Sequence, residues 1–249
     1  IYNAATIPPW FNYLQEKYQW DDNTIRSIDW TNYTDILKTF HSSWNTIVKH
    51  IHDISPTGHI SHRNDTNFPH ECPACGRPHE DNLHMITCPH ITRAQWRTET
   101  IQKLQTYDTK KSDPHLIDIL QEGIRCFHQQ IDPPDYQRYP DRYHELIQCQ
   151  NKIGWDQIYK GRWSYHWKYL QEQYRHKHQE NLAILPGSTW TREIGRLLIE
   201  QWKLLWHLRN QERHGRDQET QRKAKDQVVT AALYELYTYK NKVCPIDMQ

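Results

Sequence analysis

Three of the six cysteines in this chain lie within seventeen residues, in the pattern C-x2-C-x8-H-x3-C formed by Cys72, Cys75, His84 and Cys88. Two cysteines at this spacing can turn both thiolates toward one ion, and the following loop can return an imidazole and a third thiolate to complete a tetrahedron. Gly76 follows the second cysteine and permits the left-handed backbone of a tight turn. The pattern predicts a knuckle that holds one structural Zn²⁺, because four protein ligands leave no coordination position for a catalytic water.

The second half of this knuckle is expected to be a short helix. Asp81 is a candidate N-cap, and His84 and Cys88 are four residues apart, so they share one helix face. A redox-active C-x-x-C pair is an alternative that would need neither His84 nor Cys88, and chance clustering is another in a chain with 17 histidines. Three further histidines are possible substitute ligands, namely His70, His79 and His90.

The balance of charges excludes a protein that is basic over its whole surface. The 249 residues include 31 Lys and Arg against 30 Asp and Glu, which gives a formal net charge of +1. Any binding of nucleic acid must therefore come from a local patch. The hydrophobic fraction is only 36% and the mean hydropathy is −1.00. Because 11 Trp and 15 Tyr can each bury a large area, a thin, aromatic-rich core is expected.

The remaining cysteines point to a reducing compartment. Cys126, Cys149 and Cys244 are scattered, and this arrangement beside a C-x2-C pair does not form a disulfide framework. The chain shows neither a signal-peptide pattern nor a long apolar run, so an intracellular protein that does not span a membrane is expected, nuclear or cytoplasmic. The first residue is Ile1 and the first methionine is Met85, which indicates a piece of a longer polypeptide.

Apolar residues recur at helical spacing, and no sustained alternation indicates a sheet. The strongest stripe comprises Ile194, Leu197, Leu198, Trp202, Leu205 and Trp206. The sequence therefore predicts an all-α fold, with one or more helical bundles and a small inserted Cys3His zinc knuckle. Helices are expected over residues 10–18, 29–40, 44–54, 92–107, 113–127, 140–150, 164–179, 189–214 and 218–239.

A proline-rich segment suggests where one domain ends and the next begins. The stretch from Asp132 to Pro140 contains three prolines and is predicted to be a linker between domains. The expected parts are an N-terminal helical segment (1–58), the zinc knuckle (59–92), a helical pair packed on the knuckle (93–131) and a C-terminal helical domain (140–249).

The residues around the knuckle resemble a known family. The segment with Cys72, Cys75, Glu80, His84 and Cys88-Pro89 resembles the zinc-binding segment downstream of the polymerase domain in eukaryotic non-LTR-type reverse transcriptases. Further blocks in the expected order are Ile28-Asp29-Trp30, Ile153-Gly154-Trp155, Gly161-Arg162-Trp163-Ser164, Leu205-Trp206, Arg209-Asn210 and His214-Gly215. The resemblance thus covers most of the chain. The knuckle motif is specific to the family, whereas each tryptophan-bearing block alone is a weak match.

This resemblance implies a non-catalytic accessory domain of a retroelement-derived, reverse-transcriptase-like protein. Its partners would be RNA or DNA and an upstream reverse transcriptase domain of the same polypeptide. Two features depart from the family: three residues separate His84 from Cys88 where many members have four, and no polymerase active site is present. Asp21-Asp22 lacks the aromatic-x-Asp-Asp arrangement and is better explained as a helix N-cap. The alternative function is a zinc-stabilised protein-interaction or structural helical module.

Two enzyme classes use related motifs. A restriction-like endonuclease is a remote alternative that would use Pro134-Asp135, Glu145 and Lys152. Its acids would have to share Mg²⁺ from adjacent strands, whereas this segment is expected to be helical. A zinc deaminase needs His-x-Glu ahead of Pro-Cys-x-x-Cys and an open metal position, and this chain has neither. We therefore expect no enzymatic activity.

Two groups of basic residues are candidate nucleic-acid contacts, because arginine and lysine can meet phosphates while an exposed aromatic ring stacks on a base. The knuckle rim offers Arg63, Arg77, Arg93 and Arg97, and the second group comprises Lys160, Arg162 and Lys168. In the alternative interpretation, Trp163 and Trp167 line the core side of a helix whose outer face is simply solvated.

Overall fold

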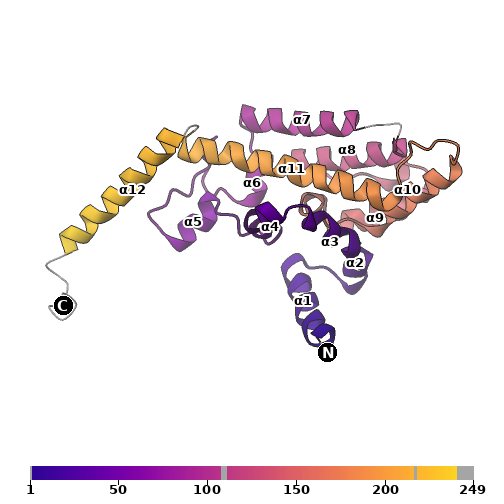
Figure 1. The fold of residues 1–249 in the computed structure, drawn as a ribbon, viewed down its shortest axis with the longest axis horizontal. Coiled ribbons are helices and arrows are strands. Elements are labelled where there is room, and N and C mark those ends of the chain that lie inside the picture. Colours follow the sequence, from indigo (N-terminus) through magenta and orange to yellow (C-terminus); the bar gives the residue numbers. More distant parts are fainter. Residues whose placement is uncertain (1, 108–110, 216–217, 240–249) are drawn as a thin grey trace. The chain divides into compact units, whose positions relative to one another are not determined.

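The computed structural model describes residues 2–107, 111–215 and 218–239, and most of them are helical (Figure 1). These residues form no β-strand and show one isolated antiparallel bridge, between Ile28 and Ser164. The prediction of an all-α fold with a Cys3His cluster is confirmed. The α-helices are α1 (Tyr2–Tyr18), α2 (Asp22–Ser27), α3 (Trp30–Lys38), α4 (Trp44–Ile51), α5 (Gly58–Asn64), α6 (Asn82–Thr87), α7 (Ile91–Thr106), α8 (Pro114–Gln129), α9 (His144–Ile153), α10 (Tyr165–Lys177), α11 (Gly187–His214) and α12 (Gln218–Tyr239).

Aspartates begin several of these helices. Asp21, Asp29, Asp81 and Asp113 are N-caps whose carboxylates accept hydrogen bonds from backbone N–H groups in the first turn. Each cap satisfies a donor that has no partner within its helix. Pro114 follows the cap at the first position of α8, where its missing N–H costs nothing. The predicted starts at Asp29, Asp81 and Asp113 and the N-cap role of the Asp21-Asp22 pair are confirmed.

Short helices without an apolar stripe were not expected. Residues 58–64 form α5, although Gly58 is its one buried residue. Residues 155–160 form the 3-10 helix η5 (Trp155–Lys160), which is buried along most of its length. The expected helix at 140–150 is divided into η4 (Asp141–Tyr143) and α9. Helices α5, η4 and η5 span at most two turns each, so periodicity in the sequence cannot identify them.

The chain forms two compact units, of which the first ends at Leu205 and the second begins at Trp206. The predicted boundary at 132–140 lies inside the first unit. The segments that follow it return to the segments before it, since α9 contacts α2 and η5 contacts α8. No described helix combines the length and apolar character needed to cross a bilayer.

The core of the first unit is rich in tryptophan, as the composition predicts. Trp163, Trp167, Trp190 and Trp202 are completely buried. Trp167 lies between two of them, with ring centroids 5.5 Å from Trp163 and 6.1 Å from Trp190. The Trp167 indole N–H donates to Gln150 Oε1 at 3.0 Å, and the Trp190 N–H donates to Ser112 Oγ at 2.7 Å. These rings therefore bury large areas without leaving those N–H groups unpaired.

Candidate metal centre

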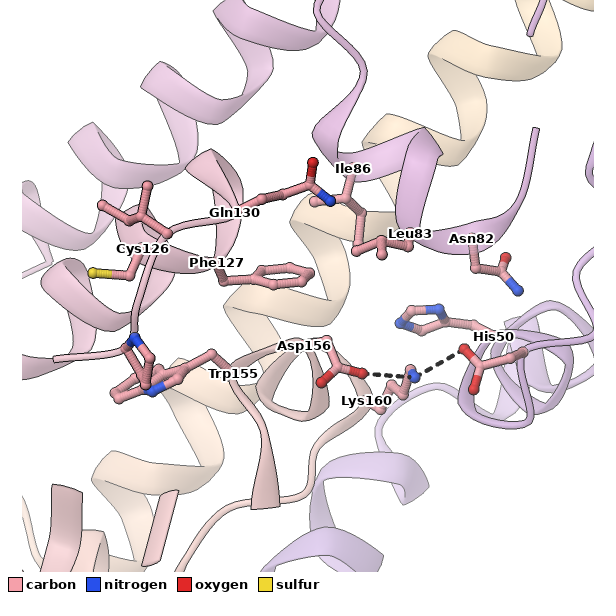
Figure 2. Close-up of a pocket in the computed structure, with 13 residues that line it drawn as sticks. His50, Asn82, Leu83, Ile86, Cys126, Phe127, Gln130, Trp155, Asp156 and Lys160 are labelled. Carbon is pink, nitrogen blue, oxygen red and sulfur yellow. Dashed lines mark hydrogen bonds and ion pairs between the residues drawn. The ribbon is translucent and has the colours of Figure 1, made fainter. Parts of the chain in front are cut away.

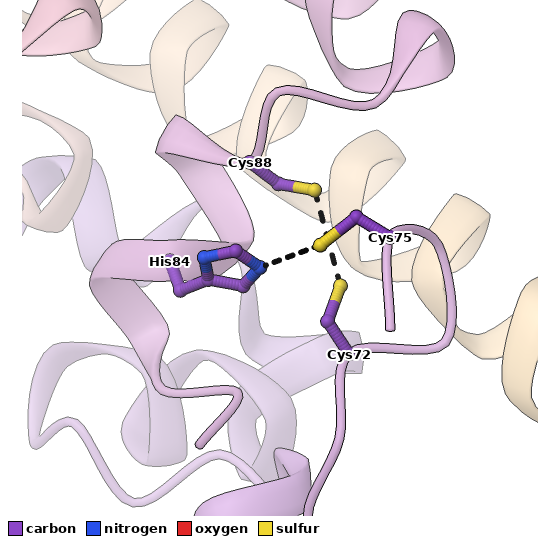
Figure 3. Close-up of side chains that lie close together, drawn as sticks. All are labelled: Cys72, Cys75, His84 and Cys88. Atoms are coloured by element: carbon purple, nitrogen blue, oxygen red, sulfur yellow. Dashed lines mark hydrogen bonds between the residues drawn. The ribbon is translucent and has the colours of Figure 1, made fainter. Parts of the chain in front are cut away.

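A tight turn presents the first two cysteines. The Cys72 backbone N–H donates to the Arg77 carbonyl at 2.8 Å, and the Gly76 N–H donates to the Cys72 carbonyl at 2.9 Å. Gly76 has φ +72°, in the left-handed region that side chains with a Cβ rarely enter. The predicted role of this glycine is confirmed. The closed turn directs both thiols to the same side of the loop (Figure 3).

Helix α6 supplies the other two residues. Asp81 caps it by accepting a hydrogen bond from the His84 N–H at 2.6 Å. The helix ends at Thr87, and Cys88 is its C-cap with extended ψ of 132°. The helix was predicted to carry both His84 and Cys88, but it ends one residue earlier, so His84 lies on α6 and Cys88 lies just beyond its end.

The four side chains form one cluster (Figure 3). Their potential ligand atoms all lie within 4.8 Å of one another. The Cys72 and Cys88 sulfurs are 3.9 Å apart, and Cys75 Sγ is 3.4 Å from His84 Nε2. Cys72, His84 and Cys88 are buried, and the Cys75 side is the more accessible one. This donor set, three sulfurs and one imidazole nitrogen, fits a single metal ion with protein ligands at every tetrahedral position.

The protonation states of the cluster favour a cation. Burial lowers the pKa of His84, and the nearby Arg77 charge lowers it further, so the ring is neutral at physiological pH and can donate a lone pair. Burial raises the pKa of the Cys72 thiol, and burial together with Cys72 raises that of Cys88 to about 12. Without a metal these thiols stay protonated. Metal binding must therefore release protons, which makes the affinity decrease as the pH falls.

Glu80 fixes helix α5 against the knuckle. Its side chain is completely buried, and Oε2 accepts a hydrogen bond from the Gly58 N–H at 2.7 Å. The Glu80 N–H donates to the His70 carbonyl at 2.9 Å, and the Glu80 carbonyl accepts from His59 at 2.9 Å. A Cβ on Gly58 would lie 2.6 Å from the His70 oxygen, so the close approach of the two segments requires glycine. Glu80, the acidic residue between the second cysteine and the histidine, thus holds the start of α5 against the loop of the knuckle.

Arg97 supports the helix that carries His84. One nitrogen of its guanidinium, Nη1, donates to the Ile86 carbonyl at 2.9 Å and to the Cys88 carbonyl at 2.8 Å. These carbonyls lie at the C-terminal end of α6, where helices leave acceptors without partners. Arg97, which was predicted to contact phosphate, therefore uses this nitrogen of its guanidinium to hold the end of α6.

The three substitute ligands lie outside the cluster. His90 caps α7, where its Nδ1 accepts from the Thr92 N–H at 3.4 Å. His79 is exposed and His70 is half-buried, their ring centroids are 5.2 Å apart, and neither belongs to the cluster. Among the described residues, Cys72, Cys75, His84 and Cys88 form the single group of three or more potential ligands.

Three of the seven candidate phosphate contacts are buried, and for these the structure corrects the prediction. Arg93 is 0% exposed, Arg162 2% and Lys160 6%. The Arg162 guanidinium donates to Gln157 Oε1 at 2.6 Å, to the Tyr18 hydroxyl at 2.9 Å and to the Ile51 carbonyl at 3.0 Å. A cation held in this way cannot reach a phosphate. Trp163 and Trp167 are both in the core, as in the alternative interpretation of that segment.

The other four candidates differ in their availability. The Lys168 ammonium is 2.7 Å from Asp29 Oδ2, and the Arg97 guanidinium donates to the Ile86 and Cys88 carbonyls. Arg63 and Arg77 are exposed, and neither side chain forms a hydrogen bond or ion pair with the described part of the chain. These two arginines are therefore the basic side chains that remain available at the knuckle rim.

The proposed nuclease residues do not come together as a metal site. Asp135 caps the 3-10 helix η3 (Tyr136–Arg138), whereas Glu145 and Lys152 lie on α9. Glu145 Oε1 is 3.3 Å from His166 Nε2. The segment is helical, as expected, and lacks the adjacent strands on which such acids share a metal.

Comparisons with known proteins give no relative: no protein-family model, no curated protein and no solved structure matches the chain.

The sequence gives no sign of a second polar group inside the first unit. His50 is buried against Trp202, with ring centroids 3.6 Å apart, and Lys160 forms ion pairs with Asp53 at 2.8 Å and Asp156 at 3.1 Å. These residues come from α4, the turn after it and η5. Local spacing links His50 with Asp53 and Asp156 with Lys160, but no pattern links these two pairs, which are more than a hundred residues apart in the chain.

Proposed function

We propose that the cluster binds Zn²⁺ and that the ion is structural. Tetrahedral zinc with Zn–S bonds of about 2.3 Å and Zn–N bonds of about 2.0–2.1 Å places two sulfurs roughly 3.8 Å apart and a sulfur and a nitrogen roughly 3.6 Å apart. Two separations in the structure, 3.9 Å between Cys72 and Cys88 and 3.4 Å between Cys75 and His84, are close to these values, and all four ligand atoms lie within 4.8 Å of one another. A structural ion also matches the donor set, because four protein ligands leave no position for a reacting water.

We further propose that the chain is a non-catalytic zinc-knuckle and helical accessory domain of a reverse-transcriptase-like protein, which assists RNA or DNA binding. The observation that carries this proposal is the closed Cys3His cluster. Glu80 supports it, since the acidic residue of the resembling segment anchors α5. The nucleic-acid role rests on Arg63 and Arg77, whose exposed guanidinium groups could meet phosphates at the knuckle rim.

Binding of single-stranded RNA at two salt concentrations tests the nucleic-acid role. The double variant Arg63→Ala/Arg77→Ala is expected to bind more weakly, and the slope of log affinity against log salt should fall in magnitude by about 1.4 for two lost phosphate contacts. Lys38→Ala/Arg196→Ala is a matched control, because it removes two exposed cations from α3 and α11. Unchanged affinity and slope in the knuckle variant would remove the nucleic-acid role from this surface.

A protein-interaction module is the second candidate function, and helix α12 favours it. Val229, Leu233, Tyr234, Leu236 and Tyr237 are each between 50% and 71% exposed. Large apolar side chains gathered on one helix are typical of surfaces that bind another protein. If this function holds, the chain should associate with a partner or with itself in a manner that high salt does not weaken. Leu236→Asp should abolish that association in sedimentation equilibrium.

A further inference from the structure

The four side chains of the metal cluster differ in their accessibility. Cys72 is 2% exposed, Cys88 is 0% exposed, and His84 is buried as well. Cys75, in contrast, is accessible to solvent. The next residue, Gly76, has open space beside it, because a Cβ at that position would meet no atom beyond the adjoining residues within 4 Å. A small solute therefore reaches the cluster from the side of Cys75.

Cys75 also lies among partners for a redox reaction. The sulfurs of Cys72 and Cys88 are within 4.8 Å of the Cys75 sulfur (Figure 3). Ligation of Zn²⁺ keeps all three sulfurs as thiolates, because a coordinating thiol loses its proton. The thiolate is the form of cysteine that attacks peroxides and disulfides. The cluster thus combines one accessible nucleophile with two further thiolates that lie close to it.

The described cysteines outside the cluster lack both properties. Cys126 lines a pocket of about 420 Å³ (Figure 2), but it is 8% exposed and no other described cysteine lines that pocket. Cys149 lies on α9 and does not belong to the cluster either. Burial raises the pKa of both thiols, so they stay protonated and react slowly with oxidants. They serve as internal controls for the reactivity of the cluster.

We propose that Cys75 is a site of reversible oxidation by hydrogen peroxide, and that its oxidation releases the metal ion. The Cys75 thiolate attacks one peroxide oxygen, so that an S–O bond forms, the O–O bond breaks and hydroxide leaves. The Cys72 thiolate then attacks the Cys75 sulfur, so that a disulfide forms and a second hydroxide leaves. Each hydroxide takes a proton from solvent. One peroxide therefore oxidises two thiolates and becomes two water molecules.

Cys72 is the expected disulfide partner of Cys75. Loss of two thiolates leaves two protein ligands, His84 and Cys88, which do not retain the ion against a chelator. In the released segment, two residues separate Cys72 from Cys75, whereas twelve separate Cys75 from Cys88, so the shorter loop costs less entropy to close. A dithiol reverses the reaction, because it reduces the disulfide and becomes oxidised to a disulfide itself. This inference rests on the proposed zinc site and adds a means of regulating it.

Release of zinc from the metal-loaded chain tests the proposal. Elemental analysis first measures the bound metal, and hydrogen peroxide is then added together with a chromophoric chelator that does not remove zinc by itself. Peroxide is expected to release the ion, and a dithiol with added Zn²⁺ should restore it. Absence of zinc at the start would overturn this inference and the proposed zinc site together. Zinc that is present and stays bound while Cys126 or Cys149 is oxidised would overturn this inference alone.

Mass spectrometry of the oxidised chain identifies the disulfide. Cleavage after glutamate separates Cys72 and Cys75, on residues 72–80, from Cys88, on residues 81–99. The fragment of residues 72–80 is expected to lack two hydrogens and to resist alkylation, whereas Cys88 should be alkylated. Oxidation that begins at Cys88 and leaves Cys75 reduced would contradict the assignment.

Two histidine variants separate the accessibility of a thiolate from the composition of the donor set. Cys75→His and Cys88→His both leave two cysteines and two histidines, a set that binds zinc in structural sites. Cys88→His keeps the accessible Cys75 beside Cys72 and should still release zinc to peroxide. Cys75→His keeps the two buried thiolates and should release zinc at least about tenfold more slowly than Cys88→His. Equal rates of release in the two variants would overturn the assignment to Cys75.

If either variant holds no zinc, the order of alkylation in the unaltered, metal-loaded chain decides. Iodoacetamide is expected to modify Cys75 before Cys72 and Cys88, because the other two sulfurs are buried. Modification of Cys72 or Cys88 before Cys75 would overturn the proposal.

Discussion

Arg162 connects three segments that are distant in the sequence. Its guanidinium donates to Tyr18 at the end of α1, to the Ile51 carbonyl at the end of α4 and to Gln157 in η5. The charge is also 4.9 Å from the centroid of the Tyr18 ring. Removing this buried side chain would leave Gln157 Oε1 without its donor, whereas the Tyr18 hydroxyl and the Ile51 carbonyl would keep only the 3.3 Å bonds that the Tyr18 hydroxyl donates to Ile51 and Asp53.

Arg162→Ala is therefore expected to lower the free energy of unfolding by about 2–4 kcal/mol, since it deletes several buried hydrogen bonds to a charged group. Arg63→Ala is the control: its exposed side chain should change the stability by less than about 0.5 kcal/mol. Urea denaturation of the metal-loaded proteins measures both. Equal stabilities of Arg162→Ala and the unaltered chain would contradict the structural role of Arg162.

His128 makes the stability depend on pH. Its Nε2 lies 2.8 Å from the Tyr159 hydroxyl, and burial, with a smaller effect of Arg97, lowers its pKa to about 3 from the ordinary value of 6.5. Between these two values the unfolded chain binds a proton at this position and the folded chain does not. The contribution of His128 is therefore complete above about pH 6.5 and decreases as the pH falls toward 3.

His128→Gln should reduce this dependence, because glutamine can still bond the Tyr159 hydroxyl but does not titrate. Between about pH 7.5 and about pH 5, the variant should lose about 2 kcal/mol less stability than the unaltered chain, at about 1.4 kcal/mol per pH unit below the unfolded pKa. Metal release affects both proteins and cancels in the difference. Identical pH profiles from urea denaturation would show that His128 is protonated in the folded state.

At the scale of the elements, helix α11 shows how an apolar stripe translates into burial. Within the first unit Ile194, Leu198, Trp202 and Leu205 are completely buried, while Leu204 is 48% exposed. Gly195 lies on the packed side, where a Cβ would come within 2.4 Å of Ile36. The 3.6-residue period therefore assigns the faces of this long helix correctly.

Two leucines of α11 test that assignment. Leu198→Ala should destabilise the chain by about 2–5 kcal/mol, because it removes a fully buried side chain and leaves a cavity. Leu204→Ala makes the same chemical change on the exposed face and should cost less than about 1 kcal/mol. Thermal or urea denaturation compares them. A loss below about 0.5 kcal/mol for Leu198→Ala would mean that this face of α11 is not packed.

The predictability of each element depends on how local its signal is. Asp81, Asp113 and Pro114 act on backbone groups within a few residues, so their roles follow from sequence alone. Helix α5 and η5 owe their positions to distant contacts, such as the bond from Gly58 to Glu80. No pattern within seven residues specifies a partner twenty-two residues away.

At the scale of the whole molecule, the metal centre was predictable and the polar group around Lys160 was not. All four ligands lie in one short segment, where spacing determines geometry, and their clustering confirms the predicted group. Lys160 meets Asp53, which is more than a hundred residues before it, through the tertiary fold alone. The sequence also does not reveal how deeply a charged side chain is buried. Arg162 lies in a basic and aromatic segment and was predicted to contact phosphate, yet its side chain is in the core.

The knuckle should depend on its metal while the rest of the first unit does not. Residues 59–90 contribute few buried apolar side chains, chiefly Met85 and Ile86 beside the cysteines, so without the ion this segment lacks a core of its own. Helices α8, α10 and α11 carry many buried tryptophan, leucine and isoleucine side chains of their own. Free energy of metal binding is therefore free energy of folding for the knuckle alone.

Chelation should accordingly remove protection from hydrogen exchange in residues 59–90 and leave α8, α10 and α11 protected. Cys88→Ser should reproduce this pattern and lose the bound metal in elemental analysis, whereas Cys149→Ser, at a free cysteine outside the cluster, should retain both metal and protection. Unchanged protection of residues 59–90 after complete removal of the metal would show that the cluster does not stabilise the fold. Loss of protection throughout the first unit would show instead that the knuckle and the helical core fold as one cooperative unit.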